Sequence, residues 1–569
     1  MTKRKLKTGS KQPAAVANSI QSVTSGVPGL DAVLGGGLPE YSFNLVAGMP
    51  GSGKTTLVQQ LLFANATNAR PALYFTVLGE PTVKMLRYQR RFEFFDPKLV
   101  GTAIQYVNLS AEALGDDLSG VLERMVAEVE RVKPAFVVVD SFRTLRDGTA
   151  RHAGGGMSMD EFVQRLALHL TSWEVTSFLI GEYTDPEQRN PVFTVADGVM
   201  WLSQVTDRNS VVRKLQIIKV RGRAPMPGLH TFRIADAGLQ IFPRIPEQQL
   251  QRRPQATHRL GTGVPGLDDV MGGGIPAGDA VMVAGPTGSG KTSFGIQFAA
   301  EGLAQGEAVV IVVFEEYPEE YLARAKAKKY NFEKMIAAGK LKLIYLRPLD
   351  LSVDETLAEI LEAVAECDAS RVIIDSLSGF EIALAPAFRE DFRESLYRLV
   401  GALTATGVTI FMTTEVAGSN PDGGFTTDRV SFITDDIIVH RFVEIDGGMK
   451  RVLTIHKMRG SEHSREFLTY EVTEDGAVVG GPLRNYNGIT TGVPQLQPRS
   501  PGRDRSGLTE REIAVLDTLV RLGDLSRDEL LVRVGFPGPE LTAALTRLAA
   551  LGFATARDSD GTYRAIART

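Results

Sequence analysis

Cysteine is almost absent from this sequence, because Cys367 is the only one in 569 residues. A single thiol excludes an internal disulfide framework and a metal site built from cysteines, and it is typical of a reducing compartment. Long hydrophobic runs are also absent, since none approaches the ~18 residues that a membrane span needs. The basic start, MTKRKLKTGSK, lacks the apolar segment of a secretory signal. We therefore expect a cytoplasmic protein with no membrane partner and a disordered tail over residues 1–22.

An excess of charge of one sign is lacking as well. The 63 basic and 67 acidic residues leave a net charge of −4, which gives no electrostatic argument for nucleic acid or an anionic membrane as a partner of the whole chain. A chain of 569 residues, 43 % of them hydrophobic, is long enough for several packed domains.

The sequence nearly repeats itself. TSGVPGLDAVLGGGLP begins at residue 24 and GTGVPGLDDVMGGGIP at residue 261, an offset of 237 (261 − 24), and the same offset separates Lys54 from Lys291. Internal repeats of this length indicate two copies of one domain. We expect two repeated domains, two polar linkers and a small third domain, with the domains at 23–246, 260–489 and 508–569 and the linkers at 247–259 and 490–507.

Each copy carries a phosphate-binding loop. GMPGSGKTT and GPTGSGKTS match the pattern GxxxxGK[ST], and each follows an apolar strand and precedes a helical pattern. Glycines let the backbone N–H groups surround phosphates, and the helix adds its positive end. The lysines would reach the β- and γ-phosphates, and Thr55 and Thr292 would hold Mg²⁺. The alternative is a pair of glycine-rich turns that bind nothing. The predicted ATP-binding residues are Gly51, Ser52, Gly53, Lys54, Thr55, Thr56, Gly288, Ser289, Gly290, Lys291, Thr292 and Ser293.

An aspartate ends a second apolar run in each copy. AFVVVDS contains Asp140 and RVIIDS contains Asp375, and such β-branched runs are typical of parallel strands covered on both faces. Ligands bind at the carboxyl ends of the strands in open α/β sheets. We therefore predict that both aspartates lie on strands neighbouring the phosphate-binding loops and hold Mg²⁺. The alternative is an aspartate that merely ends a strand.

Two adjacent carboxylates follow another buried run in the second copy. VVIVVF leads into Glu315 and Glu316, and we expect this strand to adjoin the phosphate-binding loop and bring the pair near the γ-phosphate. A carboxylate there can take a proton from the attacking nucleophile. The alternative is the acidic start of a helix. The first copy has Gly79 in place of the first glutamate and keeps only Glu80, so one copy is predicted to be chemically incomplete.

A pair of cations recurs late in each copy. LQIIKVRG contains Lys219 and Arg221, and VLTIHKMRG contains Lys457 and Arg459. Alternation along a strand would place each Lys and Arg on one face, as a finger that contacts phosphate in a neighbouring subunit. The alternative is an edge strand protected by charge.

These motifs together resemble the KaiC group of RecA-like ATPases, whose best-known members are circadian clock proteins of cyanobacteria. The resemblance covers about residues 20 to 490 and includes the paired lead-ins, both loops, the FEE element, the KxRG elements and ITDDIIVHRFVEIDGGMKRVLTIHKMRGS. It implies two tandem α/β RecA-like domains with mostly parallel sheets, a homohexamer of two stacked rings with ATP and Mg²⁺ between subunits, slow ATPase activity, autophosphorylation in the second ring and protein partners such as a KaiB-like protein. Glu315 would be the base and Ser431 the phosphoacceptor. Phe432 stands where a second acceptor is expected, so Thr434, Thr426 or Thr427 would have to take that place.

Residues 508–569 replace the short tail usual in that family. Helical apolar spacing covers Ile513, Leu516, Leu519 and Val520, and again Leu541, Leu545, Leu548 and Leu551, and DSDG separates two strand-like pieces. Three helices and a hairpin resemble a winged helix. Eight basic and nine acidic residues, with only Arg547 in the third helix, leave protein docking and DNA binding both open. Two functions therefore remain open, a self-phosphorylating ring enzyme that signals to proteins and a DNA-acting ATPase or ATP-gated transcription regulator.

Overall fold

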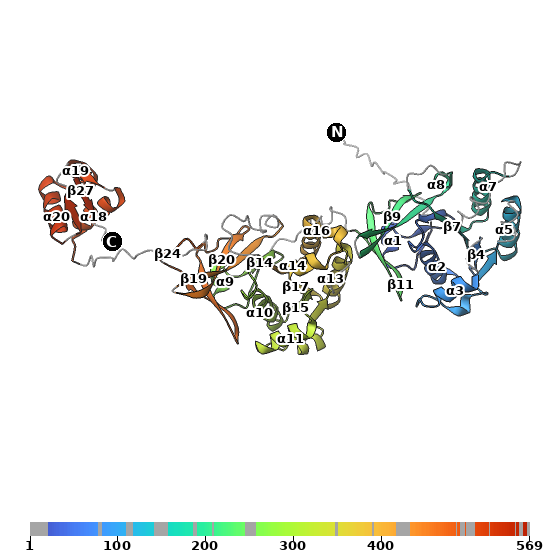
Figure 1. Cartoon of the computed structure of the whole chain (residues 1–569), viewed down its shortest axis with the longest axis horizontal. Coiled ribbons are helices and arrows are strands. Elements are labelled where there is room, and N and C mark those ends of the chain that lie inside the picture. Colours follow the sequence, from blue (N-terminus) through green and yellow to red (C-terminus); the bar gives the residue numbers. More distant parts are fainter. Residues whose placement is uncertain are drawn as a thin grey trace, which may run out of the picture. The chain divides into compact units, whose positions relative to one another are not determined.

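The computed structural model confirms two tandem α/β domains (Figure 1). Each contains a nine-stranded sheet, parallel at its centre and antiparallel beyond it. The structure describes residues 21–77, 82–109, 118–141, 157–185, 191–207, 210–244, 258–346, 351–389, 392–416, 433–445, 447–484, 486–489, 495–496, 507–522, 524–551, 553–556 and 562–565.

The first sheet has the strand order β11-β10-β9-β8-β3-β7-β6-β4-β5. Its strands are β3 (Phe43–Gly48), β4 (Ala72–Thr76), β5 (Ile104–Asn108), β6 (Phe136–Asp140), β7 (Thr176–Glu182), β8 (Gly198–Asp207), β9 (Ser210–Val220), β10 (Leu229–Ala235) and β11 (Gly238–Phe242). The lead-in contributes β1 (Ser22–Val23), α1 (Leu30–Val33) and β2 (Leu38–Pro39). The other helices are α2 (Lys54–Asn65), α3 (Thr82–Gln89), η1 (Pro97–Leu99), α5 (Leu118–Val132), α7 (Met159–Ser172) and α8 (Pro191–Val195).

The second sheet has the order β16-β15-β17-β18-β14-β19-β20-β21-β22. Its strands are β14 (Ala280–Gly285), β15 (Ala308–Val313), β16 (Leu341–Tyr345), β17 (Ala369–Asp375), β18 (Thr409–Glu415), β19 (Asp436–Ile445), β20 (Gly448–Met458), β21 (Leu468–Thr473) and β22 (Gly476–Pro482). Its lead-in is β12 (Arg259–Leu260), α9 (Leu267–Val270) and β13 (Ile275–Pro276). The other helices are α10 (Lys291–Ala304), α11 (Pro318–Ala327), α12 (Phe332–Ala337), α13 (Val353–Cys367), α14 (Leu377–Ala383), α15 (Pro386–Arg389) and α16 (Phe392–Ala405).

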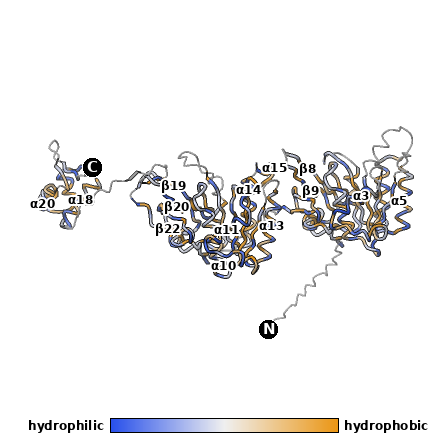
Figure 2. Tube along the Cα trace, turned by 60° about the horizontal axis from the view of Figure 1, so that its bottom comes forward, coloured by the Kyte–Doolittle hydropathy of each residue, from blue (hydrophilic) through white to orange (hydrophobic). Residues whose placement is uncertain are grey.

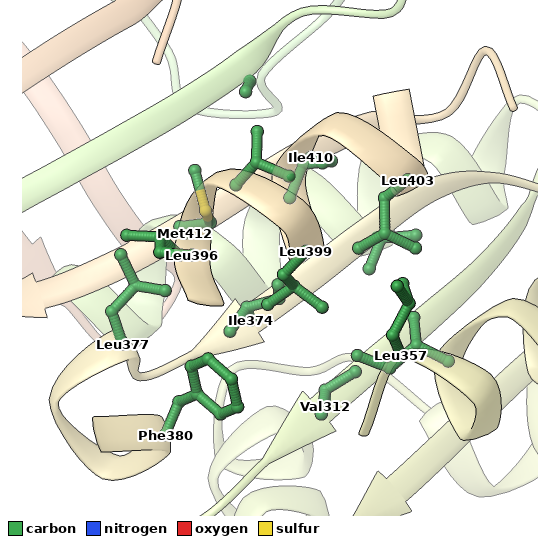
Figure 3. Packing of buried hydrophobic residues seen from close by; sticks show 14 of the residues in the cluster. Val312, Leu357, Ile374, Leu377, Phe380, Leu396, Leu399, Leu403, Ile410 and Met412 are labelled. Carbon is green, nitrogen blue, oxygen red and sulfur yellow. The ribbon is translucent and has the colours of Figure 1, made fainter. Parts of the chain in front are cut away.

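The central strands are buried on both faces, as their β-branched runs predict. In the second domain, one face packs against α13, α14 and α16, and the other packs against α10, α11 and α12. Figure 3 shows the first of these cores, in which Leu396, Leu399 and Leu403 of α16 lie near Ile374 of β17 and Ile410 of β18. Because helices cover both faces of these central strands, a ligand can reach them at their carboxyl ends.

Local sequence explains where α13 begins and ends. The Ser352 hydroxyl accepts a hydrogen bond from the backbone N–H of Glu355 at 3.1 Å, which caps the first turn. Asp368 ends the helix in the left-handed region with φ of 55°. Between them, Leu357, Ile360 and further apolar residues at helical spacing face the core. Hydropathy also alternates along the turns of α5 (Figure 2), and no helix among the described residues is both long and apolar enough to cross a membrane.

The C-terminal region forms a small unit with its own core. It contains α18 (Glu510–Leu522), β25 (Leu525–Ser526), α19 (Arg527–Val534), α20 (Gly538–Ala550), β26 (Ala554–Ala556) and β27 (Thr562–Ala565). The three strands pair antiparallel in the order β25-β27-β26. Leu516, Leu519 and Leu545 are buried, whereas Val520 and Leu551 are 63 % and 48 % exposed. The expected hairpin tip lies outside the described residues, and the comparison with winged helices stays a prediction.

Part of the expected second linker has secondary structure. Its residues Gln495–Leu496 form β24, which pairs antiparallel with β23 (Tyr486–Asn487). The expected first linker lies largely outside the described residues, although β12 begins at its last residue, Arg259. The polar, proline-containing composition therefore predicted where the connections lie. It did not predict which of their residues pair as β-strands. The basic tail is also outside the described residues, except for its last two positions.

A buried acid distinguishes the second sheet from the first. Asp436 of β19 is fully buried beside Val281 of β14, and no side-chain donor among the described residues bonds its carboxylate. Burial raises the pKa of Asp436 to about 7, the carboxylates of Asp279 and Asp435 add to the rise, and the backbone N–H of Arg459 opposes it. The matching position of the first sheet is Gly198, beside Asn44.

We expect Asp436→Asn to stabilise the protein at pH 8 by about 4 kcal/mol. The folded-state pKa lies above the ordinary 3.8. Stability from the protonated acid is therefore fully present below pH ~4 and is lost as the pH rises through about 7. Thermal unfolding midpoints at pH 5 and pH 8 measure this, with the exposed Asp475→Asn as the control. An equal pH dependence in wild type and Asp436→Asn would contradict the assignment.

Candidate functional site

The two phosphate-binding loops join a buried strand to a helix in the same way. Gly53 and Gly290 precede the first helical residue with φ of 96° and 92°, in the left-handed region that favours glycine. The backbone therefore turns sharply and brings its N–H groups around the start of α2 and α10, where a helix attracts anions. Ser52 and Ser289 are buried within these loops.

The lysine of each loop turns back toward the loop itself. Lys54 Nζ donates to the carbonyls of Gly48 and Met49 at 3.0 and 2.8 Å, and Lys291 Nζ donates to those of Gly285 and Pro286 at 2.9 and 3.0 Å. Burial lowers the pKa of both lysines, and neighbouring carboxylates oppose that shift. Both ammonium groups are thus held at the centre of their loops.

A cavity of about 550 Å³ opens beside the second loop. The predicted residues that line it are Gly288, Gly290, Lys291, Thr292, Ser293, Glu315, Glu316 and Asp375. In the first domain a cavity of about 280 Å³ is lined by Gly51, Gly53, Lys54, Thr55, Thr56 and Asp140. The fold therefore brings loop, hydroxyl and acid together in each copy, from segments about 85 residues apart in the sequence (140 − 54 = 86; 375 − 291 = 84).

The two adjacent glutamates have different surroundings. Glu316 is held by Arg324, with 2.6 Å between Oε1 and the guanidinium. Burial raises the pKa of Glu315, and the carboxylates of Glu415 and Asp375 raise it further. The Glu315 stem packs against Gly379, where an added Cβ would approach it to 2.9 Å. Burial raises the pKa of both glutamates, but the Arg324 guanidinium opposes the rise at Glu316, whereas acidic neighbours add to the rise at Glu315.

The strand order corrects two expectations. β15, which carries the glutamates, does not adjoin the loop strand β14, because β17 and β18 lie between them. The aspartate strands β6 and β17 are not direct neighbours of the loop strands either, since β7 and β18 intervene. The acids still reach the cavities, because all these parallel strands end at the same edge of their sheet.

The oxygen groups near each aspartate suit a magnesium ion. Thr55 Oγ1 donates to Asp140 Oδ2 at 3.0 Å, and Tyr74 Oη donates to the same oxygen at 2.6 Å. In the second domain Thr413 Oγ1 lies 2.5 Å from Asp375 Oδ1. A carboxylate and a hydroxyl are hard oxygen ligands of the kind that Mg²⁺ takes together with water and phosphate oxygens.

Both repeated domains match a known family. The family model described as "ATPase: KaiC" matches residues 23–245 and 260–484. The chain belongs to the KaiC ATPase family. The "Circadian clock oscillator protein KaiC" of Picosynechococcus sp. is 29% identical over 487 residues, which cover 84% of this chain and 92% of that protein. The "Circadian clock protein KaiC3" of Synechocystis sp. is 28% identical over 511 residues, 87% of this chain and 99% of that protein.

Membership in the KaiC family supports ATPase activity, and the family implies ATP binding with Mg²⁺. The residues at both cavities fit that ligand, because each combines a glycine-rich loop, a central lysine and a carboxylate with a hydroxyl nearby. Two predicted site residues, Glu80 and Ser431, lie outside the described residues, as do Gly79 and Phe432.

The predicted cationic fingers do not line the cavity of their own domain. Lys219 Nζ donates to the carbonyl of Ala196 at 2.5 Å, and Arg221 pairs with Asp197 at 3.0 Å. The Asp197 carboxylate also accepts from the backbone N–H of Phe43 at 3.0 Å, at the start of β3. This pair therefore lies where the parallel strands begin, at the end of the sheet opposite its own phosphate-binding loop.

The second copy repeats this arrangement. Lys457 Nζ donates to the carbonyl of Thr434 at 2.6 Å, and Arg459 lies 3.6 Å from Asp435, whose carboxylate accepts from the backbone N–H of Ala280. Each arginine lies just beyond the end of its strand, whereas each lysine lies within it. The predicted alternation of Lys and Arg along one strand therefore does not extend to the arginines. Arg459 remains largely exposed, at 73 % of its side chain.

Sequence reasoning missed one acid in each site. Glu182 ends β7 and Glu415 ends β18, and both line the cavities. A signal was present, since SFLIGE and IFMTTE both end an apolar run with glutamate, 233 positions apart (415 − 182). It carried no spatial meaning without the strand order, which inserts these strands between the loop strand and the aspartate strand.

Proposed function

We propose that this KaiC family member is an ATP-driven ring protein whose second domain transfers the γ-phosphate of ATP to a serine of the same protein. The observation that supports it most is Glu315, a carboxyl with a raised pKa in the cavity that also holds Lys291 and Asp375. A general base of raised proton affinity suits removal of a proton from a hydroxyl.

The proposed step is a direct displacement. The serine oxygen attacks the γ-phosphorus, the bond from that phosphorus to the bridging oxygen breaks, ADP leaves, and the hydroxyl proton passes to the Glu315 carboxylate. Lys291 would bind the phosphates. Thr292 and Asp375, and in the first domain Thr55 and Asp140, would hold Mg²⁺, which neutralises charge on the phosphates. The first domain would use Glu80 for hydrolysis.

Assembly into a homohexamer is part of the proposal. Arg221 and Arg459 are well exposed and belong to the sheet edge away from their own loops. A cation in that position lies away from the nucleotide site of its own domain and would contact the nucleotide of a neighbouring copy, as arginine fingers supplied in trans do. Lys219 and Lys457 would place these fingers through their contacts with backbone carbonyls.

Ser431 is the proposed acceptor. Phe432 offers no nucleophile, and Thr434, the nearest hydroxyl among the described residues, is 1 % exposed and has no hydrogen-bond partner for its Oγ1. A buried threonine cannot bring its oxygen to within the ~3–3.5 Å of phosphorus that transfer needs. Ser431 stands three positions earlier in the chain.

Phosphopeptide mapping after incubation with Mg²⁺ and ATP tests the acceptor. We expect Ser431→Ala to remove most of the label and Thr434→Val, the matched control, to retain it. Full label in Ser431→Ala would move the acceptor elsewhere. A wild-type protein that turns over ATP without any label would reduce the proposal to an ATPase ring.

The DNA-acting alternative gains no support from the C-terminal domain. Among the described residues of α20, Arg547 is the only basic one, and it lies 3.4 Å from Glu512. Affinity for DNA depends on basic side chains that neutralise phosphates. We therefore favour a protein partner for this domain, and a KaiB-like protein is the partner that the family resemblance suggests for the rings.

A further inference from the structure

Glu182 and Glu415 occupy the same position in their sheets. Glu415 pairs in register with Gly285, the first residue of the second phosphate-binding loop, and Glu182 pairs with Gly48 in the first. A strand that ends beside the loop strand places its last side chain at the mouth of the loop. Both copies therefore add an acid to a site that must bind a polyanion.

Several contacts hold Glu415 at the loop. Thr287 Oγ1 donates to Glu415 Oε1 at 2.8 Å, and the backbone N–H of Glu415 donates to Ser378 Oγ at 3.1 Å. The Glu415 carboxylate lines the cavity with Lys291, and it opposes the lowering of the Lys291 pKa by burial more than Asp375 or Glu315 does. Glu182 has the same relation to Lys54.

We propose that Glu415, and Glu182 in the first domain, are positioning residues that oppose the γ-phosphate and so set how strongly each site prefers ATP over ADP. The loop lysine reaches the β- and γ-phosphates, so a carboxylate beside that lysine lies near the terminal phosphate. ADP lacks this phosphate and escapes most of the repulsion. Each site thus binds ATP less tightly than its loop alone would allow.

A second consequence rests on the proposed function, in which Glu315 is the base. Glu415 and Glu315 line the same cavity. Burial raises the pKa of Glu315, the carboxylates of Glu415 and Asp375 add to the rise, and the Lys291 ammonium opposes it. Removing the Glu415 charge would lower that pKa, so the base would stay deprotonated to a lower pH. The acidic limb of the rate profile would then move to lower pH.

Equilibrium binding to the full-length protein tests the proposal, with a non-hydrolysable ATP analogue and ADP as probes. At a few ångströms in a solvent-open site one unit charge changes affinity by about tenfold. We expect Glu415→Gln to bind the ATP analogue about tenfold more tightly and ADP less than about threefold more tightly. Glu182→Gln should change the other class of sites in the same way.

Three variants separate charge from other effects. Glu415→Asp keeps the charge and should keep the wild-type preference, and Thr287→Val removes the hydrogen bond but not the charge. Glu333→Gln, at an exposed position of α12 outside the cavity, is the matched control. Equal changes for both nucleotides, or none in Glu415→Gln, would overturn the proposal.

The pH profile of phosphate transfer is measured separately. An acidic limb that lies at lower pH in Glu415→Gln than in wild type supports the proposed effect of Glu415 on the pKa of Glu315. If Glu415→Gln changes nucleotide binding as expected but wild type transfers no phosphate at any pH, the proposed function fails and the inference on nucleotide preference stands. If transfer occurs and the ATP to ADP preference is unchanged, the inference fails alone.

Discussion

Glu315→Gln is expected to slow phosphate transfer by the second domain by roughly 10²–10⁴-fold, the usual contribution of a general base. Glutamine has nearly the same shape and cannot take a proton. The loop lysine, the hydroxyls and Asp375 remain, so affinity for ATP should change little. Single-turnover transfer of labelled phosphate, measured beside nucleotide affinity, separates these two effects.

Glu316→Gln is the matched control, because Glu316 lines the same cavity but is paired with Arg324. We expect a loss of less than about tenfold in this variant. In wild type, the raised pKa of Glu315 places the loss of activity on acidification at a higher pH than an ordinary glutamate would. Unchanged transfer in Glu315→Gln, or an equal loss in Glu316→Gln, would contradict the assignment of the base.

Arg371→Met is expected to destabilise the second domain by about 3–5 kcal/mol, the usual loss when one member of a buried ion pair is removed. Arg371 is fully buried on β17 and pairs with Glu307 at 2.7 Å. Its guanidinium also donates to the carbonyls of Gly261 and Phe298, and it lies 4.5 Å from the Phe298 ring centre. Methionine fills the space but leaves these acceptors without a donor.

Urea unfolding of the full-length protein measures this loss in the transition of the second domain. Lys342→Met is the control, since Lys342 and Glu366 form an exposed pair whose removal should cost less than about 1 kcal/mol. Arg371→Lys, which keeps the charge but not the planar fork, should lie between them. Equal losses in Arg371→Met and Lys342→Met would show that the buried pair is not what stabilises this region.

Local pattern predicted the repeat, the fold class and most of both nucleotide sites. Glycine-rich loops between a strand and a helix have few other uses, and the runs that end in Asp140 and Asp375 place those acids at the ends of buried strands. The same reasoning failed on strand neighbours. Nothing in VVIVVF states which strand it pairs with, because all buried parallel strands have similar sequences.

The sequence by itself determined that this protein has two tandem P-loop domains and which residues form their loops, because the loop signature and the 237-residue offset are local or periodic features. Only the tertiary structure decided that β18 lies beside β14, which brings Glu415 to Lys291 and gives Glu315 two acidic neighbours. It also decided that Arg371 is buried where the first copy has Phe136. Such contacts join strands far apart in the chain, and pairing between them depends on packing of the whole sheet rather than on any local pattern.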